Sequence, residues 1–212
     1  MALWRPMAAA LALAIVASAV PGLASADDNA RGKELFELCA QCHGEAGEGA
    51  TLSLAPSIAG LELWYVERQL KNYRSGLRGM HPADKGGLRM YPMSLSLQSD
   101  EDLEAVAAYV ASLPPVMTEV TVEGGNAAKG AEYYNTCKAC HGDQGKGNQT
   151  MNAPRLKGTS DWYLYTTLQK FKAGVRGSNP GNANAVMMRG MALSLPDDQA
   201  IKDVIAHIHS LD

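Results

Sequence analysis

Cys39-Ala40-Gln41-Cys42-His43 is the stretch of sequence that decides the fold, and it returns 98 residues later as Cys137-Lys138-Ala139-Cys140-His141. Two cysteines that are two residues apart and followed at once by a histidine form the attachment signature of c-type haem. Disulfides, a zinc site or a thioredoxin-like redox pair are the other uses of such cysteines. The histidine after each pair, and a sequence without the βαβ pattern of thioredoxins, favour haem.

The repeat extends far beyond the two motifs. At the same offset of 98 residues, and without a gap, Trp64-Tyr65 matches Trp162-Tyr163 and Arg78-Gly79 matches Arg176-Gly177. A repeat that covers most of a chain indicates a duplicated structural unit. We therefore predict two similar domains, each with one haem.

The N-terminal residues have the three parts of a secretory signal peptide. Arg5 supplies a positive charge, residues 7–20 form a short apolar run, and Ala24-Ser25-Ala26 has the small residues at which such peptides are cleaved. We predict a signal peptide over residues 1–26, cleavage after Ala26 and export to the periplasm. An uncleaved N-terminal anchor is the alternative.

The rest of the chain divides near Pro114-Pro115. We predict a first domain over residues 27–113, a linker over 114–125 and a second domain over 126–212. A domain of this size has a limited apolar interior, so a large flat cofactor would enlarge its core. The haem is therefore expected to be part of the fold.

Each copy has the apolar spacing of helices. We predict a first helix over 29–39 and 126–137, and a middle helix over 61–74 and 160–172. A last helix follows Ser99 in one copy and Pro196-Asp197 in the other. The expected fold is all-α, with a few helices wrapped around each haem.

Two further segments carry a resemblance to a known family. Pro56-Ser57-Ile58-Ala59-Gly60 and Pro154-Arg155-Leu156-Lys157-Gly158 follow the haem motifs at matching distances. With these segments and the tandem motifs, the chain resembles the di-haem cytochrome c4 family, which is built from class I cytochrome c domains. The resemblance implies that the carbonyls of Pro56 and Pro154 accept the second ring N–H of the ligating histidines. In the alternative, these prolines only shape a turn.

The haem ligands follow from the motifs and from this resemblance. Cys39, Cys42, Cys137 and Cys140 would bind two haem c groups covalently, and His43 and His141 would be axial ligands of the iron. Methionine is the expected sixth ligand. Met90 and Met93 both recur, as Met188 and Met191. In the family the ligand lies seven residues before the apolar residue that precedes the last helix, which selects Met90 and Met188. Met93 and Met191 remain the alternative pair.

An iron with both axial positions filled suits electron transfer rather than catalysis. We predict an electron carrier between a quinol-level donor, either a quinol-oxidising complex or a dehydrogenase, and a terminal oxidase or reductase. Peripheral membrane association fits this role, whereas no catalytic residue and no nucleic-acid partner is expected. The alternatives are an electron-accepting di-haem subunit of a dehydrogenase, such as flavocytochrome c sulfide dehydrogenase, and a di-haem enzyme with an open iron site.

Charge is unevenly shared between the two copies. Residues 27–125 contain 8 basic and 15 acidic residues, whereas residues 126–212 contain 10 basic and 7 acidic residues. Such an asymmetry predicts that the two ends of the molecule attract different redox partners. Charges that only solvate the surface are the alternative.

Overall fold

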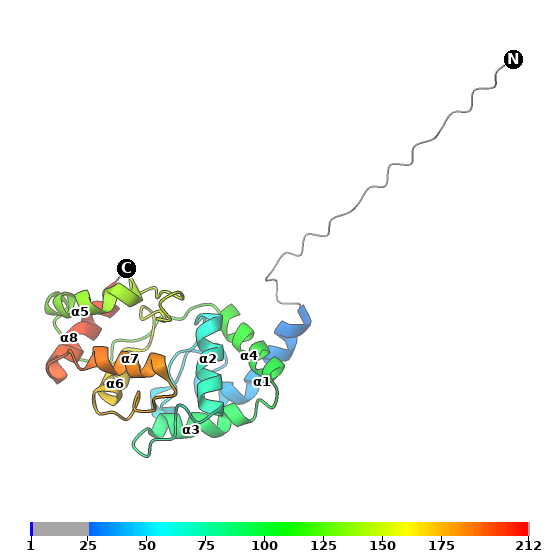
Figure 1. Cartoon of the computed structure of the whole chain (residues 1–212), viewed down its shortest axis with the longest axis horizontal. Helices are drawn as coiled ribbons and strands as arrows, with labels where there is room; N and C mark the ends of the chain where they lie inside the picture. Colours follow the sequence, from blue (N-terminus) through cyan, green and yellow to red (C-terminus); the bar gives the residue numbers. More distant parts are fainter. Residues whose placement is uncertain (2–25, 212) are drawn as a thin grey trace.

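The computed structural model describes Met1 and residues 26–211, and it consists of helices with no strand in this part of the chain. The predicted signal peptide lies almost wholly outside the described residues. Two groups of four α-helices follow one another along the chain (Figure 1). The first comprises α1 (Ala26–His43), α2 (Leu63–Arg74), α3 (Lys85–Leu95) and α4 (Asp100–Ser112), with a short 3-10 helix, η1, at Thr51–Ser53. The second comprises α5 (Ala127–His141), α6 (Asp161–Lys172), α7 (Ala183–Ala192) and α8 (Asp198–His209).

The two groups repeat the same packing. The first helix of each group packs against the last, and the second packs against both the third and the last. The first and last helices approach closely because each crossing contains a glycine. A Cβ on Gly32 would overlap the carbonyl oxygen of Ala105, and one on Gly130 would overlap that of Asp203. The duplication seen in the sequence is thus a duplication of the fold.

Each domain has its own apolar core. The last helix supplies half or more of the core residues in each domain. The starts of these two helices are fixed by side-chain caps: Ser99 accepts the amide N–H of Asp102, and Asp197 accepts that of Ala200. The core residues of the first domain are Phe36, Leu70, Leu97, Leu103, Val106 and Val110. Those of the second domain are Tyr134, Leu164, Leu195, Ala200, Ile201, Val204, Ile205 and Ile208.

Helices α3 and α7 were not among the elements expected from the sequence. Both begin at a capping residue that occupies the same place in the repeat, Asp84 before α3 and Asn182 before α7. The oxygen of each side chain accepts the amide N–H of the residue three positions later. These two helices carry all four candidate methionines.

Polar contacts join the two domains. The amide of Ser57 donates to the hydroxyl of Ser160 at 3.1 Å. Arg155 donates through its guanidinium to the carbonyl of Ala59 at 2.7 Å, and its backbone amide donates to the carboxylate of Glu62 at 2.9 Å. The loop that follows each haem motif therefore lies against the other domain.

The linker is held against the second domain by one buried carboxylate. Asp161, at the start of α6, is 2 % exposed and accepts the backbone N–H groups of Thr121 and Val122 at 2.6 and 2.7 Å. It also accepts the hydroxyl of Thr121 at 2.6 Å. In the described part of the chain, no helix is long and apolar enough to cross a membrane.

Candidate functional site

Both motif histidines are buried and fixed in orientation. The Nδ1 atom of His43 lies 2.9 Å from the carbonyl oxygen of Pro56, and that of His141 lies 2.7 Å from the carbonyl oxygen of Pro154. Each histidine is 6 % exposed. Because a carbonyl only accepts hydrogen bonds, Nδ1 carries the proton and Nε2 is left as the ligating atom of a neutral ring.

The environment favours neutral imidazoles as well. Burial lowers the pKa of His43 and of His141, and this outweighs the opposite effect of the hydrogen bond to the proline carbonyl. Neutral imidazole is the form that binds metal ions. Both rings are therefore prepared, in position and in protonation, to bind iron.

Cys42 and Cys140 directly precede the histidines at the ends of α1 and α5, and Cys39 and Cys137 lie one helical turn before the histidines. None of the four forms a disulfide. Burial raises the pKa of Cys39 and of Cys137 to about 11. A reactive redox cysteine has a lowered pKa instead, so these environments do not favour a thioredoxin-like pair. The described residues also contain no group of three or more potential ligands that could hold a zinc ion.

A single cavity of about 500 Å³ extends across both domains and connects the two motifs. Its wall is largely apolar. Both histidines and all four candidate methionines line it: His43, Met90, Met93, His141, Met188 and Met191.

The methionines differ in how they meet this cavity. Met90 is half-buried and packs against the core of the first domain. Met188 is half-buried and packs against the small cluster that contains Phe171. Met93 and Met191 are each 37 % exposed. The structure brings all four to the cavity that also contains the histidines.

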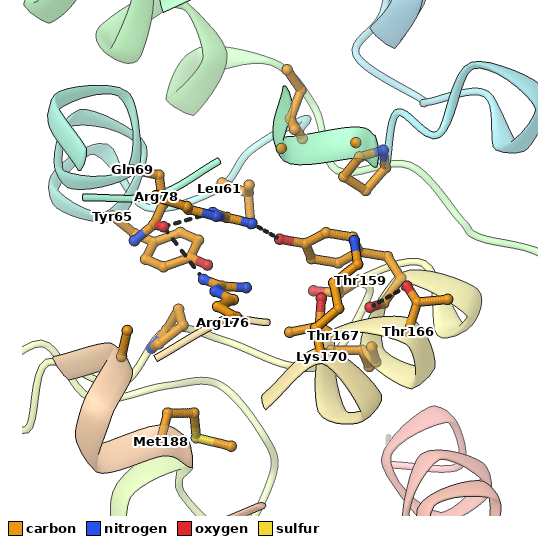
Figure 2. A pocket seen from close by; sticks show the side chains of 18 of the residues that line it. Leu61, Tyr65, Gln69, Arg78, Thr159, Thr166, Thr167, Lys170, Arg176 and Met188 are labelled. Atoms are coloured by element: carbon orange, nitrogen blue, oxygen red, sulfur yellow. Dashed lines mark hydrogen bonds between the residues drawn. The ribbon is translucent and has the colours of Figure 1, made fainter. Parts of the chain in front are cut away.

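Cationic groups that the sequence analysis did not select line the cavity between the two domains. Arg78 donates to Gln69 at 2.6 Å and to the hydroxyl of Tyr163 in the second domain at 2.8 Å (Figure 2). Arg176 of the second domain donates to the same Gln69 at 3.4 Å. The signal for the two arginines was present in the sequence, because Arg78 and Arg176 occupy the same place in the repeat.

These cationic side chains have free hydrogen-bond donors that fit an anionic group. Among the described residues, the buried Nε atoms of Arg68, Arg78, Arg155 and Arg176 have no hydrogen-bond partner. Although burial alone would raise it, the pKa of Tyr163 is lowered by the charges of Arg78 and Arg176. Two haems would bring four propionate carboxylates, and guanidinium groups bind carboxylates strongly. The residues of the cavity therefore fit haem in three ways. The apolar wall fits the porphyrin ring, the histidine nitrogens and methionine sulfurs fit the iron, and the arginines fit the propionates.

Two tandem helical domains, each with a Cys-x-x-Cys-His motif and a methionine-bearing helix on one cavity, define a di-haem c-type cytochrome. A family model described as cytochrome c matches residues 29–114 and again residues 127–212. The chain belongs to the di-haem cytochrome c4 family. It is an electron carrier with two covalently bound haem c groups, one at Cys39 and Cys42 and one at Cys137 and Cys140.

Individual relatives support this assignment. Cytochrome c4 of Azotobacter vinelandii is 31 % identical over 212 residues, which cover 94 % of this chain and 99 % of the relative. The thiosulfate dehydrogenase electron acceptor of Stutzerimonas stutzeri is 32 % identical, with 80 % of this chain and 78 % of the relative covered. The crystal structure of reduced cytochrome c4 from Pseudomonas stutzeri superposes with a TM-score of 0.69 at 26 % identity, covering 87 % of this chain and 98 % of the other.

Proposed function

We propose that residues 27–212 form a periplasmic electron carrier between a quinol-oxidising complex or dehydrogenase and a terminal oxidase or reductase. Domains at 27–113 and 126–212, joined by a linker at 114–125, and cleavage after Ala26 are parts of the same proposal. The observation that carries it is the duplicated set of a buried, oriented histidine and a core-packed methionine on one shared cavity.

The axial ligands in this proposal are His43 with Met90 and His141 with Met188. The burial of the methionines supports the choice, because a ligand held against the core loses little freedom when it binds iron. Met93 and Met191, whose side chains are more exposed, are the alternative pair. Thioether bonds from the cysteines would retain both cofactors outside the cell.

The residues of the site perform distinct parts of this task. The carbonyls of Pro56 and Pro154 hold the imidazole rings in one orientation, and a fixed ligand changes little when an electron arrives. Methionine sulfur favours the reduced state of the metal and so raises the reduction potential. When bound, each haem supplies an iron that alternates between its ferric and ferrous states. The apolar wall keeps water away from it.

Charge at the two motifs supports separate docking surfaces. Around the first motif the surface carries the exposed carboxylates of Glu37, Glu45 and Glu48. In the second copy Lys146 replaces Glu48, and Lys138 stands where the first copy has an alanine. Complementary charge steers association. The acidic surface of the first domain would therefore bind a partner with a basic surface, and the more basic surface of the second domain would bind a partner with an acidic surface.

A second candidate function is that of electron acceptor for a dehydrogenase. The relative from Stutzerimonas stutzeri is named as the electron acceptor of a thiosulfate dehydrogenase. This relative favours a thiosulfate dehydrogenase over the flavocytochrome type as the donor enzyme. Reduction of the purified protein by such an enzyme with thiosulfate, at a rate above that with quinol analogues and a quinol-oxidising complex, would support it.

Optical spectra of methionine variants test the proposed ligands. Met90→Ala and Met188→Ala should each remove about half of the red absorption band that is typical of methionine bound to ferric haem. The matched variants Met93→Ala and Met191→Ala should retain it. The reverse pattern would assign iron to Met93 and Met191. The ferrous wild-type protein should not bind carbon monoxide, and rapid binding would instead favour an enzyme with an open iron site.

A further inference from the structure

An ion pair joins the two domains next to the methionine helix of the first. The Nζ atom of Lys170, on α6, lies 2.8 Å from Oδ1 of Asp84 in the first domain. The Asp84 side chain is only 5 % exposed and that of Lys170 is 27 % exposed. Figure 2 shows Lys170 on the wall of the shared cavity.

Asp84 also determines where α3 begins. Its Oδ1 atom accepts the amide N–H of Gly87 at 3.1 Å, which caps the helix. A Cβ on Gly87 would overlap the Asp84 carboxylate, so the helix start and the carboxylate are in close contact. Although burial alone would raise it, the pKa of Asp84 is lowered, mainly by the hydrogen bond and the charge of Lys170. The carboxylate is therefore a charged cap.

The second domain has no equivalent of this pair. The residue that corresponds to Asp84 is Asn182, a neutral cap of α7, and the residue that corresponds to Lys170 is Asn72. Among the described residues, Asn72 and Asn182 form no hydrogen bond with each other. Within residues 26–211, only the first methionine helix is thus held by a charged side chain from the other domain.

We propose that Lys170 is a positioning residue for the methionine ligand of haem 1, the haem attached at the first motif. By holding Asp84 it fixes the start of α3, and α3 carries both Met90 and Met93. The inference rests on the proposed methionine ligation, and it holds for either of these two methionines. Haem 2, attached at the second motif, has no such dependence on the first domain.

Imidazole binding to the ferric protein provides the test, because imidazole competes with a loosely held methionine. Two background variants separate the haems: in Met188→His the remaining red band reports haem 1, and in Met90→His it reports haem 2. Lys170→Met should weaken the band of haem 1 and increase its imidazole affinity roughly tenfold, because a buried carboxylate left unpaired destabilises the helix start. Haem 2 should not change.

Further variants separate positioning from general damage. Lys170→Arg preserves the ion pair and should restore wild-type behaviour, and Asn72→Met, the matched change in the repeat, should leave haem 2 unaltered. Asp84→Asn keeps a capping oxygen and should shift haem 1 in the same direction by a smaller factor.

Each remaining outcome has a definite meaning. An unchanged haem 1 in both Lys170→Met and Asp84→Asn, an equal change at both haems, or a change at haem 2 alone would overturn the proposal. If Met188→His alone leaves the band intact, the ligand assignment is wrong, and Met191→His and Met93→His become the background variants in which Lys170→Met is measured.

Discussion

The hydroxyl of Tyr163 in the second domain accepts a hydrogen bond from the guanidinium of Arg78 in the first, at 2.8 Å. Tyr65, its counterpart in the repeat, has no such bond to Arg176 in the described structure. The arginine–tyrosine contact between the domains therefore forms in one direction only in the described structure, although both residues occur in both copies. Arg78 also lies over the ring of Tyr73, with 4.5 Å between its central carbon and the ring centroid, so it is held from several sides.

Tyr163→Phe should destabilise the protein by roughly 1.5–3 kcal/mol, because it removes a hydrogen bond to a charged donor in a buried place. Tyr65→Phe is the matched control and should cost less than about 0.5 kcal/mol. Denaturant unfolding of the holoprotein measures both. Equal losses in the two variants would show that the interdomain bond contributes nothing specific.

Asp161→Asn should lower the free energy of unfolding by about 2 kcal/mol or more at neutral pH, because the linker amides lose a buried charged acceptor. The pKa of Asp161 is lowered: burial opposes this shift, but hydrogen bonds from Thr121, Val122 and Trp162 outweigh it. A carboxylate with a lowered folded-state pKa stabilises the protein above its unfolded-state pKa of about 4 and ceases to do so as the pH falls through the folded-state value.

The difference between wild type and Asp161→Asn should therefore be constant from neutral pH down to about pH 5, and decrease below about pH 4. Denaturant unfolding at a series of pH values measures it. A difference that persists undiminished at the lowest pH would contradict the assignment of the effect to the carboxylate charge.

Gly130→Ala should destabilise the second domain by about 1–3 kcal/mol, since the new methyl group would force α5 away from the carbonyl of Asp203 on α8. Gly190→Ala is the control. Gly190 is an exposed helical glycine of α7 with no atom within 4 Å of its would-be Cβ, so alanine should be neutral or stabilising by up to about 1 kcal/mol. Thermal unfolding of the two variants distinguishes crowding from helix propensity.

Lys146→Glu should slow oxidation of haem 2 by the anion ferricyanide about threefold or more at low ionic strength, because the local potential becomes negative. Glu48→Lys, its counterpart, should accelerate oxidation of haem 1 by the same reagent. Stopped-flow rates at rising salt concentration provide the check. If the rates did not change with either substitution or with salt, these charges would only solvate the surface.

The sequence predicted most of the helices because apolar spacing reports directly on a buried face. The last helices, with Ser99 before one and Asp197 before the other, are clear examples. Helices α3 and α7 were missed because Gly86-Gly87 and Pro92 mask α3, and because α7 is short. Their caps, Asp84 and Asn182, were the available signal.

The repeat identified the residues of the site that both copies share, but not the residues that differ between the copies. It selected the cysteines, the histidines and the two candidate methionine pairs, because both copies keep them. Several contacts between domains depend instead on residues that differ between copies, such as Glu62 and Lys170, whose counterparts are Ser160 and Asn72. A comparison of the copies discards such positions, so this part of the interface could not be inferred from it.

The shared cavity makes the two halves of the chain depend on each other. Both halves line the same cavity, and Arg78 of the first is hydrogen-bonded there to Tyr163 of the second. A half expressed alone would expose to water an apolar, cationic surface that its twin normally covers. We therefore expect each half to need the other in order to keep water from its part of the cavity.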